Sequence, residues 1–220
     1  MVWIDIITFF IIIGLWVGYS YFEWKERDSS IMGYIDYYRK EWMTQMLKRE
    51  LRMVDTGIVT MLGRSNTMFA STSVAVMAAI ITVMASYESV YQAIGGISYS
   101  WPTSKIAWDI KFSCLLFVIV YGFFKFIWSL RQFNFAAVMI GAAPDKSEAD
   151  TAEAKRLALK TARLLEKGMG NFTLGLRSYY FAIALLAWIF HPVLGIIAAT
   201  MVVITLYRRE FYSKDFGLRG

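Results

Sequence analysis

The sequence has few of the residues that build reactive sites or disulfides. Its 220 residues include one cysteine, one histidine and three prolines. A single cysteine, Cys114, excludes an intramolecular disulfide and a cluster of thiolate metal ligands, and its place in an apolar run favours a packing role. We identify no nucleophile–base pair and no set of metal ligands. The sequence therefore predicts a protein that is not an enzyme and that needs no cofactor or metal.

Charge is scarce as well. Only 18% of the residues are charged, whereas about 25% are charged in soluble domains. Hydrophobic residues make up 57% of the chain. From Ser178 to Tyr207 there is no charged residue, and this run is longer than the roughly 20 residues that cross a bilayer. The chain is therefore predicted to be an integral membrane protein.

Four apolar stretches, at about residues 2–22, 66–87, 106–130 and 178–207, predict four transmembrane helices. The two long connections, 23–65 and 131–177, hold eight basic residues each, whereas 88–105 holds one. Because basic residues collect on the cytoplasmic side, we expect both long arms in the cytoplasm and the amino terminus outside. The same placement accounts for the net charge of +6 without a nucleic-acid partner. We expect a multi-pass protein of the bacterial inner membrane.

The last apolar stretch allows two arrangements. One long helix kinked at Pro192 would leave the carboxyl terminus outside, although that end carries Arg208, Arg209, Lys214 and Arg219. A re-entrant hairpin turning at His191-Pro192 would return this end to the cytoplasm, but each half would hold only about 14 residues, too few to span. Proline removes an amide donor and clashes with the preceding turn, which explains a kink. The kinked helix is the prediction, and the hairpin is the alternative.

The basic arms have helical patterns. Apolar residues at helical spacing predict one helix over residues 31–62, continuous with or close to the second span. Apolar residues beyond Leu130 extend the third helix to a break at residues 141–144. Ser147 to Asp150 has the form of a capping box that opens a helix over 150–167, and residues 169–171 are expected to form a turn. The predicted fold is all-α, a single membrane domain over 1–220 with about four transmembrane helices and a cytoplasmic helical extension.

His191 and Pro192 are the first candidates for function. An ionisable side chain within a membrane is a functional hypothesis by default, as a proton relay or ligand. The alternative is a structural histidine that bonds to a backbone group near Pro192. The sequence favours the structural role, because no second histidine or nearby carboxylate accompanies His191.

Three hydroxyl residues, Ser71, Thr72 and Ser73, give the second span an unusual polar segment. Hydroxyls in a membrane helix bond to their own backbone or to neighbouring helices. This favours a role in helix packing, and the alternative is that they line a solute path.

Charged residues near the spans supply further candidates. Arg39, Arg49, Arg52 and Asp55 form the densest charged group, which either binds anionic lipid headgroups or includes an intrahelical pair of Arg52 with Asp55. In the third span, Asp109 and Lys111 are expected near the outer interface, and Lys125 is expected to extend towards the cytoplasmic headgroups.

Three stretches have a distinctive order and spacing. They are Arg39-x-x-Trp42 with Met46, Arg49, Arg52, Asp55, Asn66 and Phe69–Ser73; then Arg131–Phe135 with Ile140–Pro144; and finally Gly175–Ala182 with Trp188 and Leu206–Phe211. Together they resemble the domain-of-unknown-function family 599, which comprises membrane proteins of bacteria and plants. The resemblance covers nearly the whole chain and implies about four spans. It implies no activity, cofactor or catalytic residue.

The predicted function is non-enzymatic and depends on association. We expect a homo-oligomer or an accessory subunit of a larger membrane complex, with membrane lipids and other membrane subunits as partners. The alternative is a small-solute or ion transporter or channel with a path near His191 and Ser71–Ser73.

Overall fold

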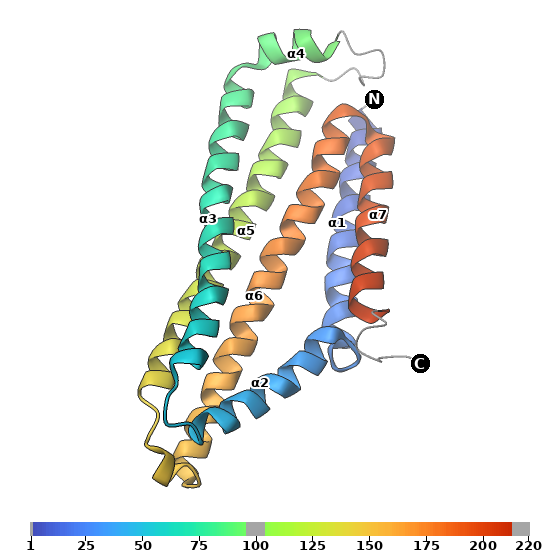
Figure 1. The fold of residues 1–220 in the computed structure, drawn as a ribbon. Helices are drawn as coiled ribbons and strands as arrows, with labels where there is room; N and C mark the ends of the chain where they lie inside the picture. Colours follow the sequence, from blue (N-terminus) through green and yellow to red (C-terminus); the bar gives the residue numbers. More distant parts are fainter. Residues whose placement is uncertain (1, 96–103, 213–220) are drawn as a thin grey trace.

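The computed structural model describes residues 2–95 and 104–212, which form an elongated helical bundle (Figure 1). We call the end of the bundle where α1 begins the upper end, and the opposite end, which holds α2, the lower end. The elements in chain order are α1 (Val2–Lys25), the 3-10 turn η1 (Arg27–Ser29), α2 (Ile31–Leu47), α3 (Met53–Ala85), α4 (Tyr87–Gly95), α5 (Lys105–Gly141), the 3-10 turn η2 (Lys146–Glu148), α6 (Ala152–Phe190) and α7 (Pro192–Phe211).

Five of the described helices are long and apolar enough to cross a membrane: α1, α3, α5, α6 and α7. The all-α prediction is confirmed for the described residues, but the expectation of about four spans is wrong by one helix. The difference arises in the last apolar stretch, where the chain forms two helices instead of one.

The predicted kinked helix over residues 178–207 is wrong. His191 is extended, with φ −156° and ψ 133°, so α6 ends at Phe190 and α7 begins at Pro192. Proline disfavours helical backbone at the residue before it and fits the first position of a new helix. The two helices then fold back on each other (Figure 1). This hairpin differs from the re-entrant alternative, in which each half is too short to span a membrane. Here α6 runs from Ala152 to Phe190 and α7 from Pro192 to Phe211, so both helices of the hairpin are long.

Gly195 allows the hairpin to close. A Cβ atom at this position would lie 2.7 Å from the Trp188 Cβ and 3.0 Å from its Cα. Such separations are shorter than real Cβ contacts, so a side chain larger than hydrogen would push α7 away from α6. The backbones of the two helices therefore approach closely at Gly195, as small residues allow in membrane bundles.

The predicted helix end before Gly168 and the turn at residues 169–171 are also wrong, because α6 continues through both. Gly168 and Gly175 face aromatic rings of α5 rather than ending a helix: a Cβ at Gly168 would lie 2.8 Å from Phe133, and one at Gly175 2.6 Å from Phe126. The Ser129 hydroxyl donates a hydrogen bond of 2.6 Å to the Gly168 carbonyl across the same interface. Close packing on α5 explains these glycines.

Two other predicted boundaries differ from the structure. The helix expected over residues 31–62 is divided between α2, which ends at Leu47, and α3, which begins at Met53. The capping box expected at Ser147 is not used, because the Thr151 hydroxyl accepts the hydrogen bond of the Ala154 amide and caps α6. The extension of the third helix to the break at residues 141–144 is confirmed by α5.

The bundle has two hydrophobic cores. The upper core joins α1, α3, α5, α6 and α7 and includes Ile12, Leu115, Phe181 and Trp188. The lower core joins α2, α3, α5 and α6 and includes Met43, Phe133 and Leu165. At 1.5 Å per residue, α6 is about 58 Å long, whereas a bilayer core is only about 30 Å thick. The lower parts of α5 and α6 therefore form, with α2, a helical extension of the apolar bundle.

Candidate functional site

Two cavities lie one above the other where α1 faces α5 and α6. α1 packs against α7 and α6, whereas α5 packs against α3 and α6 (Figure 1). We call this feature the α1–α5 groove. It contains an upper cavity of about 310 Å³, lined by Asp5, Ile6, Phe9, Phe10, Ala107, Ile110, Lys111, Cys114 and Trp188.

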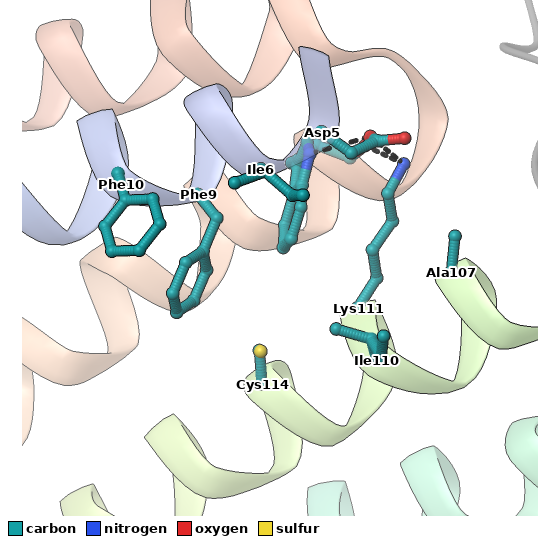
Figure 2. Close-up of a pocket in the computed structure, with 9 residues that line it drawn as sticks. Asp5, Ile6, Phe9, Phe10, Ala107, Ile110, Lys111 and Cys114 are labelled. Atoms are coloured by element: carbon teal, nitrogen blue, oxygen red, sulfur yellow. Dashed lines mark hydrogen bonds and ion pairs between the residues drawn. The ribbon is translucent and has the colours of Figure 1, made fainter. Parts of the chain in front are cut away.

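An ion pair lies at the upper end of this groove (Figure 2). The Lys111 ammonium of α5 lies 2.7 Å from a carboxylate oxygen of Asp5 in α1. The Lys111 side chain is 1% exposed and the Asp5 side chain 12% exposed. Removing one member of a buried pair strands the other charge, which costs about 3–5 kcal/mol. The pair therefore ties the start of α1 to α5.

Trp188 of α6 completes this cluster. Its indole N–H donates a 3.1 Å hydrogen bond to the same Asp5 oxygen, and its backbone carbonyl accepts a 3.3 Å hydrogen bond from Lys111. The Lys111 ammonium also lies 5.2 Å from the centre of the Trp188 ring, within the range of a cation–π contact. Three helices therefore meet in one charged cluster inside the apolar part of the bundle.

Below the ion pair, the upper cavity is apolar. Phe9, Phe10 and Ile6 of α1 face Ile110 and Cys114 of α5 across it (Figure 2). Cys114 is partly buried, so the predicted packing cysteine lies in a cavity wall. The cavity has the size and lining to hold a hydrocarbon group, such as an acyl chain or a large apolar side chain.

Aromatic rings divide the groove at mid-height. Trp16 of α1 stacks on Phe181 of α6 at 5.5 Å and meets Tyr121 of α5 edge-on at 5.7 Å. Each of the three residues lies between the levels of the upper and lower cavities on its own helix. The rings therefore separate the apolar upper cavity from a polar lower one.

Arg177 of α6 dominates the lower cavity. Its side chain is 4% exposed and lies 3.5 Å from Glu23 of α1. It donates a 3.2 Å hydrogen bond to the Ser20 hydroxyl, and its guanidinium lies 4.9 Å from the centre of the Tyr19 ring. Its Nε has no hydrogen-bond partner among the described residues. A second buried cation therefore joins α1 to α6.

The predicted group of Arg39, Arg49, Arg52 and Asp55 falls into separate networks. Asp55 is fully buried, pairs with Arg49 and accepts a 2.6 Å hydrogen bond from the Trp42 indole. Arg52 does not pair with Asp55, because its guanidinium donates to the backbone carbonyls of residues 143 and 144 in the α5–α6 connection. Asp55 and Arg52 therefore hold the α2–α3 turn and the α5–α6 connection in place.

Arg39 lies elsewhere on α2. It pairs with Asp36, whose other carboxylate oxygen lies 2.8 Å from Arg27. Burial lowers the pKa of Arg39 below its ordinary value, and the charge of Asp36 opposes this shift. Partial burial also disfavours the charge on Arg27, but the hydrogen bond and charge of Asp36 outweigh it and raise the pKa of Arg27. Asp36 therefore binds two arginines, one from η1 and one from α2.

Of the three candidate residues with hydroxyl side chains, Ser71, Thr72 and Ser73, the last two donate hydrogen bonds to backbone carbonyls of their own helix. Thr72 donates to the Met68 carbonyl, and Ser73 bonds both to the Phe69 carbonyl and, at 2.9 Å, to the Tyr179 hydroxyl of α6. Ser71 is exposed on α3. The bond between Ser73 and Tyr179 is the contact between helices that the packing interpretation predicts.

His191 and Pro192 form the turn between α6 and α7. The His191 Nδ1 accepts a 3.2 Å hydrogen bond from the Val193 amide and caps α7. This geometry agrees with the structural interpretation, and a proton-relay role stays a prediction. Tyr179, the partner of Ser73, lies twelve residues before His191 on α6, about 18 Å along the helix axis. The structure therefore does not bring the predicted path residues together.

A comparison with models of protein families identifies the family of this chain. The model of the family described as "Protein of unknown function, DUF599" matches residues 7–215. The chain belongs to this family. The predicted resemblance is thus confirmed, and the family adds no residue roles. No curated protein and no solved structure matches the chain.

The buried charged residues of the groove are not among the sites predicted from the sequence. The sequence predicts Lys111 near the outer interface, whereas in the structure its side chain is buried and paired with Asp5. Lys125 is partly buried and lies 3.5 Å from Asn171 of α6. One feature of the sequence could have indicated them, namely a charged residue within a predicted transmembrane stretch. Asp5 lies in the first such stretch and Lys111 in the third. Their pairing could not be predicted, because it depends on how the helices pack.

Proposed function

We propose that this family member is a non-enzymatic membrane protein that acts by association, through the α1–α5 groove. The observation that carries the proposal is the apolar upper cavity beneath the Asp5–Lys111 pair. The buried charges in and below it hold helices to one another, as Arg177 does between α6 and α1. These contacts leave an apolar recess between the helices, and an apolar side chain of a partner membrane protein, either a second copy or another subunit, could dock into it.

The single cysteine provides the test, because Cys114 lines the upper cavity. A thiol-directed photo-cross-linker attached there in native membranes should capture a protein of defined mass, which mass spectrometry identifies. The control is Cys114→Ser combined with Ile81→Cys, which moves the thiol to an exposed position on α3. The proposal fails if Cys114 captures only lipid, or if the protein elutes alone as a monomer after purification in mild detergent.

We also propose a topology for the five helices. The lower end holds the basic residues of α2, the α5–α6 connection and the end of α7, including Arg208 and Arg209 (Figure 1). With five crossings, this whole end faces the cytoplasm of an inner membrane and satisfies the positive-inside bias. The amino terminus then lies outside, and the conflict between the basic carboxyl end and four spans disappears.

The second candidate function is a small-solute or ion transporter or channel. It is favoured by ionisable pairs in both cavities of one groove, Asp5–Lys111 and Glu23–Arg177. Intramembrane charges often mark solute or proton pathways. In reconstituted vesicles, Asp5→Asn should then abolish uptake, and His191→Gln should change its pH dependence if the predicted path near His191 is used. Uptake that is equal for wild type and both variants would exclude this candidate.

A further inference from the structure

The lower cavity combines charges of both signs at the end of an apolar helix. It has a volume of about 330 Å³ and lies between the end of α1, η1, the start of α2 and the middle of α6. Its basic lining residues are Arg27, Lys167 and Arg177, and its acidic ones are Glu23 and Glu166. Ligand pockets start at about this size.

The ion pairs inside this cavity are loose. Arg177 lies 3.5 Å from Glu23, and Arg27 lies 3.6 Å from Glu166. Charge-assisted hydrogen bonds are usually about 2.7–2.9 Å long, as in the 2.8 Å contact of Arg27 with Asp36. The guanidinium and carboxylate groups therefore keep hydrogen-bonding capacity for a guest.

Arg177 is the most specific part of this cavity. Its side chain is 4% exposed, and its Nε is buried with no partner among the described residues. Arg177 lines the cavity, and an acceptor oxygen brought by a guest would give its guanidinium a closer partner than the 3.5 Å contact with Glu23. Guanidinium groups match the oxygens of phosphate in particular.

The two glutamates of the cavity favour a guest that also carries a positive charge. Glu23 and Glu166 line the same cavity as the arginines, so a phosphate alone would meet two carboxylates as well. A guest that carries both a phosphate and a primary ammonium would satisfy both sets. An ammonium with three N–H groups can donate to both carboxylates, which a quaternary ammonium cannot do.

The position of the cavity indicates a lipid. Trp24 lines it and is 69% exposed at the end of α1. Tryptophan at the end of an apolar helix marks the headgroup level of a bilayer, and Leu174 adds an apolar wall. We propose that the lower cavity of the α1–α5 groove binds the headgroup of a phospholipid with a phosphate and a primary ammonium, of the phosphatidylethanolamine type. This site does not depend on the partner of the upper cavity.

The test is a titration of the full chain in mild detergent, with bound lipid counted by native mass spectrometry. The probes are dioctanoyl phosphatidylethanolamine, phosphatidylcholine and phosphatidylglycerol, together with water-soluble O-phosphoethanolamine. We expect the ethanolamine lipid to bind about tenfold more tightly than the other two lipids, since one charged hydrogen bond accounts for such a ratio. Equal affinities for the three lipids would overturn the proposal. If O-phosphoethanolamine binds as tightly as the ethanolamine lipid, the lipid proposal is overturned and the ligand is a soluble phosphomonoester.

A matched pair of variants separates the site from nonspecific effects. Glu166 is 33% exposed, so Glu166→Gln should leave the fold intact, which its melting curve checks. We expect Glu166→Gln to lower the affinity for the ethanolamine lipid about fivefold and to leave that for phosphatidylglycerol unchanged or higher. The control is Glu50→Gln, which removes a 78% exposed carboxylate outside the cavity. Loss of the preference in both variants, or in neither, would contradict the assignment of the cavity.

Discussion

At the scale of single residues, the buried charges of this protein connect helices that are distant in the sequence. Asp5 and Trp188 are 183 residues apart, yet they share a hydrogen bond, and Lys111 binds both. Such a cluster is stable only while every member keeps its partners, because a charge without a partner is costly to bury. The contribution of each residue therefore depends on the others.

Lys111→Met should lower the free energy of unfolding by about 3–5 kcal/mol, because it leaves the Asp5 carboxylate without its cation. The double variant Asp5→Leu with Lys111→Met should lose less than Lys111→Met alone, since no charge is stranded. Thermal or denaturant unfolding in detergent measures both. Lys160→Met, at an exposed position of α6, is the control. A double variant that is less stable than Lys111→Met would contradict this prediction.

The bond between Ser73 and Tyr179 predicts a coupled pair. Ser73→Ala and Tyr179→Phe should each cost about 0.5–1.5 kcal/mol of stability, and the double variant should cost no more than the larger single effect. Thr72→Ala serves as a control, because among the described residues the Thr72 hydroxyl bonds to a carbonyl of its own helix and to no other helix. If the two effects add in full, Ser73 does not link α3 to α6.

At the scale of elements, the hairpin of α6 and α7 decides how many helices are long and apolar enough to cross a membrane. The turn depends on Pro192, which begins α7, and on Gly195, which admits the Trp188 backbone. Proline interrupts a helix in either arrangement, so the sequence predicts a kink at the same place. The sequence alone could not distinguish a bend from a reversal, since only the packing of α7 on α6 and α1 does so.

Gly195→Leu should separate α7 from α6, because its Cβ alone would lie 2.7 Å from the Trp188 Cβ. We expect a loss of stability of about 1–3 kcal/mol or more, as for overpacked interiors. Gly14→Leu is the matched control: it lies on α1, and apart from its chain neighbours and the adjoining backbone of α1, no described atom lies within 4 Å of the position its Cβ would take. Melting temperatures in the same detergent compare the two. Equal melting temperatures would show that α7 does not pack closely at Gly195.

At the scale of the whole molecule, five long apolar helices place the start of α1 and the end of α7 at opposite ends of the bundle (Figure 1). The lower ends of α5 and α6 extend past the groove and build a second core with α2. This division agrees with an apolar bundle that carries a helical extension on one side.

Reporter fusions test the proposed topology. A fluorescent protein fused after residue 220 should be active in the cytoplasm, and an alkaline phosphatase fused there should be inactive. Because the proposed topology has five crossings between the two ends, a reporter before residue 1 should show the opposite behaviour. Both termini on one side would contradict the five-span arrangement and restore an even number of crossings.

Helix length, composition and motif spacing are local properties of the chain, so the all-α class, the apolar character, the basic arms and the family could be predicted from the sequence. The tertiary structure decided the reversal at His191, the continuity of α6 through Gly168, and the pairs Asp5–Lys111 and Glu23–Arg177. These depend on which helix faces lie against each other. Since a pattern along one helix does not specify its neighbour, the α1–α5 groove could be recognised only in the folded chain.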